Sequence, residues 1–316
     1  MKLSKLLIIA IAALFFSACS TEEEPLARHE LVFQASMGNN ETRATSDGSW
    51  TVGDIVAVRV GTTVKKYQIT TPDGKLCGAD AYNTFYWEDF EGSSVEVTAW
   101  SFGQKYVSSL SDGVTIESDQ SVEEKYYNSD FLYAKSTLVN KGDLSILSFF
   151  HQMARVNINI KYDEAAEIET VELGSLGNAS SCYVQANYTE PVADTDEDPV
   201  PDYGTFDIDD NDNGVAVIPN KVSTVEGYDA SYSAIIVPFT YEAFGICITL
   251  TNGSKFSYIG GIYNNNNNTV DPFDPGTVNT FNITIKNKVL KVDGPFDAAT
   301  GQTMDPVSVN DWIYQH

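Results

Sequence analysis

Short runs of hydrophobic and β-branched residues, often alternating with polar ones, recur along almost the whole chain. Gly, Asn, Asp and Pro separate these runs, and the turn-forming stretches at 72–74 and 252–253 stand between two of them, as hairpin turns do. This pattern predicts an all-β protein, with one helical turn near Ser121–Tyr127. The expected strands are Leu31–Ser36, Ile55–Val60, Val64–Thr70, Val95–Phe102, Phe131–Lys135, Leu144–Phe150, Ala154–Tyr162, Val215–Pro219, Ser233–Phe239, Gly245–Thr251, Lys255–Ile259 and Thr280–Lys286.

The first residues follow another pattern. Two lysines precede an apolar run over residues 6–16, and two small residues then lead to Cys19. A run of this length is too short to cross a bilayer as a helix, so residues 1–18 are expected to be a signal peptide. A Cys directly after the cleavage site favours a lipoprotein lipidated on Cys19 over an ordinary secreted protein. Residues 19–29 contain three consecutive glutamates and form an acidic tether, which is either a surface-export signal or a plain linker.

Composition narrows the range of functions. The 316 residues suffice for two domains, expected at 30–142 and 143–316, with an acidic loop insertion at 190–214 in the second. The formal net charge of −25 repels phosphate backbones, so we expect no nucleic-acid partner. Beyond Cys19 there are three cysteines, an odd number that argues against a disulfide framework but leaves one pair open. The three histidines are far apart in sequence, which makes a zinc site improbable.

Few residues suggest chemistry. Asp209, Asn211 and Asn213 match the first half of a calcium loop, but the twelfth position is Asn220 instead of Glu, so a solvated turn is the favoured interpretation. His151 lies within an apolar run and is interpreted as structural rather than catalytic. No nucleophile elbow, phosphate loop or dinucleotide-binding turn is present in the sequence. We therefore expect no enzyme, no metal and no cofactor.

Several segments together resemble the fimbrillin family of Bacteroidetes, the subunits of type V pili. No single segment is specific, but their order and spacing over nearly the whole mature chain are. They are the first strand Leu31–Ala35, the polar stretch Thr42–Thr45, Trp50 with Gly53 and Asp54, the strand Ile55–Val58, the segment Phe150–Ile158, and Gly276–Ile285 followed by Leu290, Val292, Val309 and Trp312.

The resemblance implies two tandem transthyretin-like β-sandwich domains with Greek-key-type connections. It also implies that an arginine-specific protease cuts the loop after the first strand, at Arg43, although Arg43 could equally be an ordinary loop residue. The first strand would then leave, and a strand of another subunit would fill the groove. The displaced strand would comprise Leu31, Val32, Phe33, Gln34 and Ala35. The candidate donor strand, which could instead close its own domain, contains Val307, Val309, Trp312 and Tyr314.

The favoured function is therefore a structural subunit of an adhesive fimbria, held on the outer membrane at the cell surface by its lipid, with other fimbrial subunits and an arginine-specific surface protease as partners. An uncleaved anchor or tip subunit is an alternative. A second alternative is a surface glycan-binding lipoprotein, with Trp87 or Trp100 as stacking platforms. The nearby aromatic residues Tyr82, Phe85 and Tyr86 could stack on sugars too, although core packing is the commoner role of such residues.

Overall fold

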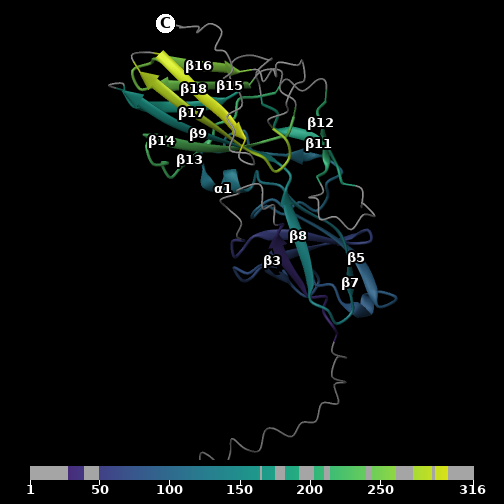
Figure 1. The fold of residues 1–316 in the computed structure, drawn as a ribbon. Helices are drawn as coiled ribbons and strands as arrows, with labels where there is room; N and C mark the ends of the chain where they lie inside the picture. The colour runs from purple at the N-terminus through teal and green to yellow at the C-terminus, as the bar shows by residue number, and fades with distance from the viewer. Residues whose placement is uncertain are drawn as a thin grey trace, which may run out of the picture.

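The computed structural model describes residues 28–38, 50–163, 166–174, 182–191, 203–209, 214–239, 244–260, 273–286 and 289–297. Figure 1 shows an elongated, two-lobed arrangement of strands, with most strands up to β8 in one lobe and the later strands in the other. Several predicted site residues lie outside the described residues: Cys19, Arg43, Asn211, Asn213, Val307, Val309, Trp312 and Tyr314.

The first lobe is a seven-stranded sheet that closes on itself, in the order β1-β4-β3-β2-β5-β7-β8. Hydrophobic residues alternate along its strands and fill the interior, so the closed sheet surrounds a core. The strands are β1 (Phe33–Met37), β2 (Ile55–Val60), β3 (Thr63–Ile69), β4 (Lys75–Gly78), β5 (Ser94–Ser101), β7 (Leu132–Asn140) and β8 (Ser145–His151), and a short 3-10 helix, η1 (Trp87–Asp89), precedes β5.

The second lobe contains a five-stranded sheet, in the order β13-β14-β9-β17-β18, and a three-stranded sheet, in the order β10-β15-β16. Their strands are β9 (Ala154–Asp163), β10 (Ile168–Leu173), β13 (Asn220–Val222), β14 (Ala230–Ile236), β15 (Phe244–Leu250), β16 (Lys255–Gly260), β17 (Val278–Lys286) and β18 (Val289–Asp297). Side chains from both sheets, such as Ile158 and Ile248, form one core. The two sheets therefore pack face to face.

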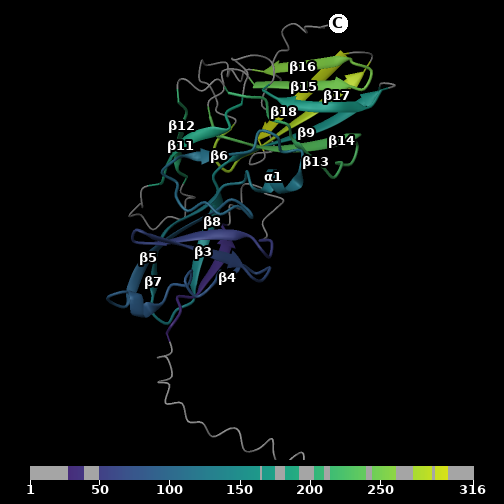
Figure 2. The ribbon, with the colours of Figure 1, turned by 180° about the vertical axis from the view of Figure 1, so that it is seen from behind.

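A third hydrophobic cluster joins the lobes. It contains Trp100 and Tyr133 from the closed sheet and Ile235 from β14. A small sheet in the order β12-β11-β6 lies beside it and contains β6 (Val114–Thr115), β11 (Gln185–Thr189) and β12 (Thr205–Asp207). The helix α1 (Glu123–Tyr127) lies beside β13, as both ribbon views show (Figures 1 and 2). Because β6 and α1 come from the connection between β5 and β7, the first half of the chain contributes to the second lobe.

The all-β prediction is confirmed, and β2 has the bounds expected from the sequence. The helical turn expected near Ser121–Tyr127 is α1. The tandem transthyretin-like domains stay a prediction, and the first sheet closes as a barrel instead of forming two separate layers. The domain division after residue 142 also stays a prediction; it falls between β7 and β8, which belong to the same sheet. None of the helices in the described ranges is long and apolar enough to cross a membrane.

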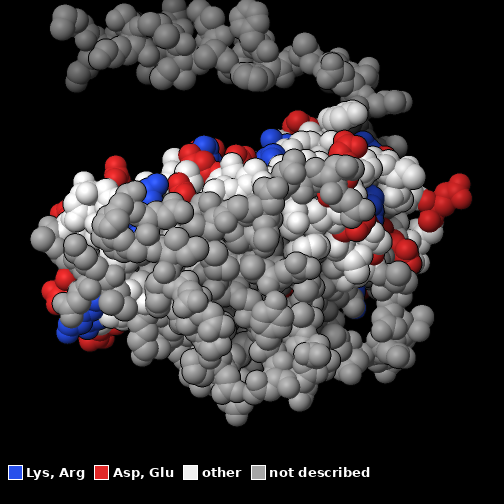
Figure 3. Space-filling view, turned by 90° about the horizontal axis from the view of Figure 1, so that it is seen from above, with Lys and Arg blue, Asp and Glu red and all other residues white. Residues whose placement is uncertain are grey.

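On the face seen from above, red acidic side chains and fewer blue basic ones stand along the rim (Figure 3). The described residues visible on that face form no broad basic patch. This distribution agrees with the formal net charge of −25.

Candidate functional site: the position of strand β1

Strand β1 completes the closed sheet. It pairs antiparallel with β4 over Phe33 and Gln34. On its other side it pairs in parallel with β8, from Phe33 opposite Ser145 to Met37 opposite Phe149. Because β1 is the only link between β4 and β8 in the order of this sheet, its departure would leave each of them with an unpaired edge.

The inner face of β1 is buried. Leu31, Phe33 and Ala35 are 3%, 0% and 1% exposed and belong to the core of the closed sheet, whereas Val32 is 44% exposed. The Phe33 ring meets Tyr67 edge-on, with 5.5 Å between ring centroids. Burying a Leu or Phe side chain contributes about 1.5–3 kcal/mol. The strand therefore fills a slot whose hydrophobic lining would otherwise face water.

The strand lies slightly later in the chain than expected. The regular strand is Phe33–Met37, whereas the sequence predicted a displaced strand at 31–35. Leu31 and Val32 are attached outside the regular ladder: the Leu31 amide donates to the Phe85 carbonyl at 2.9 Å, and the Val32 carbonyl accepts from the Ser145 amide at 3.2 Å. The segment that a departing strand would remove is therefore longer than β1 itself.

The turn at 72–74 holds the middle of β1. The Ala35 amide donates to the Gly74 carbonyl at 2.8 Å, and the Gln34 side chain donates to the Asp73 carbonyl at 2.9 Å. Gly74 has φ +89°, and a Cβ at this position would lie 2.0 Å from the Ala35 carbonyl oxygen. Only glycine therefore permits this approach of the turn to the strand.

The N-terminal end of the segment is fastened by a group of residues that we call the N-terminal clasp: Arg28, His29, Tyr86, Glu88 and Asp89. Arg28 forms an ion pair with Asp89, and its guanidinium lies 3.9 Å from the Tyr86 ring centroid. His29 Nδ1 lies 2.7 Å from Glu88 Oε1. The hydrogen bond with His29 lowers the pKa of Glu88 to about 2. The side chains of the clasp are largely exposed, so their ion pairs add little to the stability of the fold. Their effect is to fix where the N-terminal end of the segment lies.

The other residues singled out from the sequence have structural roles. Trp87 and Trp100 are 6% and 1% exposed, so the predicted sugar-stacking platforms at these residues are wrong. Both side chains pack in hydrophobic clusters, because burying the large apolar surface of the indole ring gains more free energy than burying its single N–H costs. Asp209 is exposed, and the described residues contain no group of three His, Cys, Asp or Glu side chains able to hold a metal ion. Cys77, Cys182 and Cys247 are free thiols.

His151, at the end of β8, is paired with Asp130. Its Nδ1 lies 2.9 Å from the carboxylate. Burial alone would raise the pKa of Asp130, but the charge and hydrogen bond of His151, together with the charge of Arg155, lower it. His151 Nε2 is buried and has no hydrogen-bond partner among the described residues. Sequence reasoning assigned His151 a structural role but missed Asp130, because nothing in the sequence links residues that are brought together by folding.

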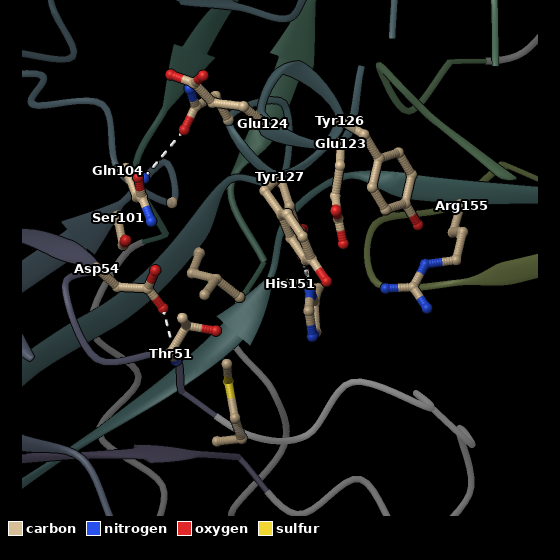
Figure 4. A pocket seen from close by; sticks show the side chains of 15 residues that line it. Thr51, Asp54, Ser101, Gln104, Glu123, Glu124, Tyr126, Tyr127, His151 and Arg155 are labelled. Carbon is tan, nitrogen blue, oxygen red and sulfur yellow. Dashed lines mark hydrogen bonds and ion pairs between the residues drawn. The ribbon is translucent and has the colours of Figure 1, made fainter. Parts of the chain in front are cut away.

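His151 faces a cavity of about 290 Å³ between the open end of the closed sheet and α1 (Figure 4). Thr51 and Asp54 line one side, and Tyr127 and Arg155 line the other. Burial raises the pKa of Asp54, and a hydrogen bond from the Thr51 amide opposes this shift. The cavity is thus lined by charged and aromatic groups from both lobes.

The structure defines a two-lobed, all-β protein whose first sheet is completed by its own strand β1. A family model described as fimbrillin-like matches residues 42–312, so the chain belongs to the fimbrillin-like family. A search of curated proteins found no match.

Three solved structures share the fold. A candidate cell adhesion protein of Bacteroides uniformis is 18% identical, with a TM-score of 0.56 over 83% of this chain and 95% of that one. Another from Bacteroides ovatus is 16% identical, with a TM-score of 0.55 over 92% and 99%. A third, from Bacteroides fragilis, is 12% identical, with a TM-score of 0.50 over 84% and 96%.

Proposed function

We propose that the chain is a structural subunit of an adhesive fimbria at the cell surface. In this proposal it is exported as a lipoprotein held in the outer membrane through Cys19, and an arginine-specific surface protease cuts it at Arg43. The segment that contains β1 then leaves, and a strand of another subunit takes its place. Membership of the fimbrillin-like family supports this role, and so do the names of the structural relatives as candidate cell adhesion proteins.

The position of β1 is the observation that carries the proposal. A strand that lies between β4 and β8 can be exchanged for another strand without rebuilding the rest of the sheet. The incoming strand gains main-chain hydrogen bonds along both neighbours and buries its alternate side chains in the slot. In a regular strand Val307 and Val309 share one face and Trp312 and Tyr314 share the other, so one of these two hydrophobic pairs would enter the slot.

Strand loss and strand gain are expected to be coupled. The buried Leu31 and Phe33 side chains together contribute about 3–6 kcal/mol, a large fraction of the total stability of about 5–15 kcal/mol that a domain has. A barrel that lost β1 without a replacement would expose its core. Cleavage at Arg43 therefore permits the exchange, and the incoming strand drives it. The two sandwich domains, 30–142 and 143–316, remain part of this proposal.

A reversible disulfide tests strand exchange separately from cleavage. Ser36 and Ser148 are paired in register on β1 and β8, and their Oγ atoms lie 3.5 Å apart, so a Ser36→Cys/Ser148→Cys chain can form a bond between the strands. The purified chain without its signal peptide is treated with an arginine-specific protease, and assembly is followed by detergent-resistant gel ladders and electron microscopy. We expect cleavage in both redox states but ladders only after reduction.

Two outcomes would contradict the proposal. Ladders that form while the disulfide is intact would show that assembly does not use the β1 slot. If the unmodified chain stays intact and monomeric in the presence of the protease, the proposal of a subunit activated by cleavage is wrong. The role of an anchor or tip subunit would then remain. Arg43→Ala is the matched control for cleavage, since it keeps β1 and its neighbours unchanged, and it should abolish the ladders.

A further inference from the structure

A groove of about 710 Å³ lies on the second lobe, away from the β1 slot. Its floor includes Asn157 and Asn159 of β9, Ser233 of β14 and Thr280 of β17. These side chains alternate with core residues along their strands, so they lie on the face of the five-stranded sheet opposite its hydrophobic core. α1, which lies beside β13 in Figure 2, forms one wall, and the segment 220–225 forms another.

The polar groups of the floor are held in fixed orientations. Ser233 Oγ donates to Asn157 Oδ1 at 2.9 Å, and because Ser233 thereby uses its one proton, the Tyr126 hydroxyl 2.9 Å away donates to it. Asn159 accepts from Ser231 at 2.8 Å and donates to Asn282 at 3.0 Å. Neighbouring side chains thus fix the Asn157 and Asn159 amides before any ligand arrives.

Part of the hydrogen-bonding capacity remains available. Among the described residues, Asn157 Nδ2, the Asn220 side-chain amide and Thr280 Oγ1 have no hydrogen-bond partner, and all three residues line the groove. They offer both donors and acceptors, and none of them carries a charge. A ligand with closely spaced hydroxyl groups, which both donate and accept, would satisfy them.

An aromatic side chain stands at the border of the groove. Tyr127 is 48% exposed and lines both this groove and the adjoining cavity of about 290 Å³, which share Glu123, Tyr126 and Arg155 as well. In the view of Figure 4, Tyr127 overlaps His151, and Tyr126 and Arg155 stand to one side of them. A half-exposed tyrosine beside fixed amides and hydroxyls suits a sugar, whose ring has an apolar C–H face as well as hydroxyl groups.

The charges around the two cavities favour an uncharged ligand. The groove itself is lined by one carboxylate, Glu123, and two cations, Arg155 and Lys221, whereas Asp54, Glu124 and Asp130 line only the adjoining cavity. Asp130 lies near enough to Arg155 for their charges to interact, so the charge of Arg155 is offset. The other two charges of the groove, Glu123 and Lys221, are opposite in sign, so the groove offers no net charge to attract an ionic ligand.

We infer that the groove binds a neutral oligosaccharide. Its volume is within the range of about 300–1,000 Å³ that small-molecule sites have, which leaves room for more than one sugar ring. The site does not involve β1, β4 or β8, so it is independent of the proposed strand exchange. A chain that binds sugar without polymerising would support sugar binding alone. A chain that polymerises without binding sugar would support strand exchange alone.

The test uses the intact chain and immobilised neutral tri- to pentasaccharides built from glucose, galactose, mannose, xylose or N-acetylhexosamine. Hits are measured in solution by calorimetry, and matched sialylated forms serve as anionic probes. We expect at least one neutral probe to bind, with about tenfold loss of affinity in Tyr127→Ala and in Thr280→Val, as expected when one contact of about 1.4 kcal/mol is removed. The sialylated form of the same sugar should bind no more tightly, because the groove offers an anion no net positive charge.

Two matched variants control for general damage. Thr284→Val changes the same residue type on the same face of β17 but outside the groove lining, and Tyr106→Ala removes a 38% exposed tyrosine that lines neither cavity. Both should bind like the unmodified chain. The inference is overturned if no neutral probe binds at millimolar concentration, or if Tyr127→Ala and Thr280→Val, shown to be folded by circular dichroism, bind as well as the controls.

Discussion

Arg59 on β2 and Glu190 directly after β11 form a doubly hydrogen-bonded ion pair across 131 residues of sequence, with N–O distances of 2.7 and 2.5 Å. The Tyr133 hydroxyl also donates to Glu190, at 2.9 Å. These contacts lower the pKa of Glu190, with the hydrogen bond from Arg59 as the largest cause. The pair lies next to the cluster that contains Trp100 and Tyr133, so it joins the closed sheet to the second lobe.

Arg59 and Glu190 should be energetically coupled. In a double-mutant cycle with Arg59→Ala and Glu190→Ala, we expect a coupling free energy of about 1–2 kcal/mol, because the bidentate geometry is good while partial exposure screens the charges. Urea denaturation measures it. The exposed pair Asp119–Lys125, with atoms 3.5 Å apart, is the control and should couple by less than about 0.5 kcal/mol. Equal coupling in both pairs would contradict the role given to Glu190.

Phe33 should dominate the stability of the β1 segment. Phe33→Ala is expected to lower the free energy of unfolding by about 3–5 kcal/mol, because it leaves a cavity in a fully buried position. Val32→Ala, on the exposed side of the same segment, should cost less than about 0.5 kcal/mol. Similar losses for both variants would mean that β1 does not sit in the slot described.

Gly74 should be intolerant of a side chain for two separable reasons. Gly74→Ala places a methyl group against the Ala35 carbonyl and also strains a backbone with φ +89°. Gly227 has φ +91° and nothing within 4 Å of an added Cβ, so Gly227→Ala carries the strain alone. We expect Gly227→Ala to cost about 1 kcal/mol and Gly74→Ala clearly more, with faster hydrogen exchange at the Ala35 amide. Equal effects would argue against the close approach.

The Asp130–His151 pair should make stability depend on acid pH. The native pKa of Asp130 is lowered, so below the ordinary carboxyl range the unfolded chain holds more protons than the native one. Stability from this pair is therefore fully present above about pH 4 and is lost as pH falls towards the native pKa. Asp130→Asn should flatten this part of the curve of unfolding free energy against pH, and an unchanged slope would reject the assignment.

The thiols should differ in reactivity. Burial raises the pKa of Cys182 to about 12, whereas Cys77 is only half-buried. In a Cys19→Ser chain at pH 8, iodoacetamide should modify Cys77 in the folded state and Cys182 only after denaturation. Peptide mass spectrometry with and without urea distinguishes the sites. Rapid labelling of Cys182 in the folded chain would contradict its burial.

Local patterns in the sequence predicted most strands but not their partners. Ile55–Val60 is an almost wholly apolar run rich in β-branched residues that ends at Gly61, so β2 could be placed residue by residue. β18, at Val289–Asp297, was missed because its sequence interrupts hydrophobic residues with Lys, Asp, Gly and Pro, which is tolerated at the edge of a sheet. The sequence does not show which strands become neighbours in a sheet. The closure of the first sheet through β1 could therefore not be predicted from it.

The candidate sites show the same limit. Glu190 belongs to a stretch whose composition predicts an exposed insertion, yet it is half-buried. The ion pair with Arg59, which is distant in sequence, offsets the cost of burying its charge. The aromatic residues near Trp87 suggested a sugar surface, whereas the groove proposed here is formed mainly by Asn, Ser and Thr side chains from separate strands. Such residues are common on any exposed sheet, and only their convergence in space distinguishes them.

The closure of the first sheet also determines when association can begin. Among the described strands, those of this sheet all have neighbours on both sides while β1 is in place. A chain in this state has no free edge in that sheet for another copy, so raising its concentration alone should not nucleate a polymer through it. For the proposed fimbria, the onset of growth is therefore set by the rate of a covalent event and not by a critical concentration of subunits.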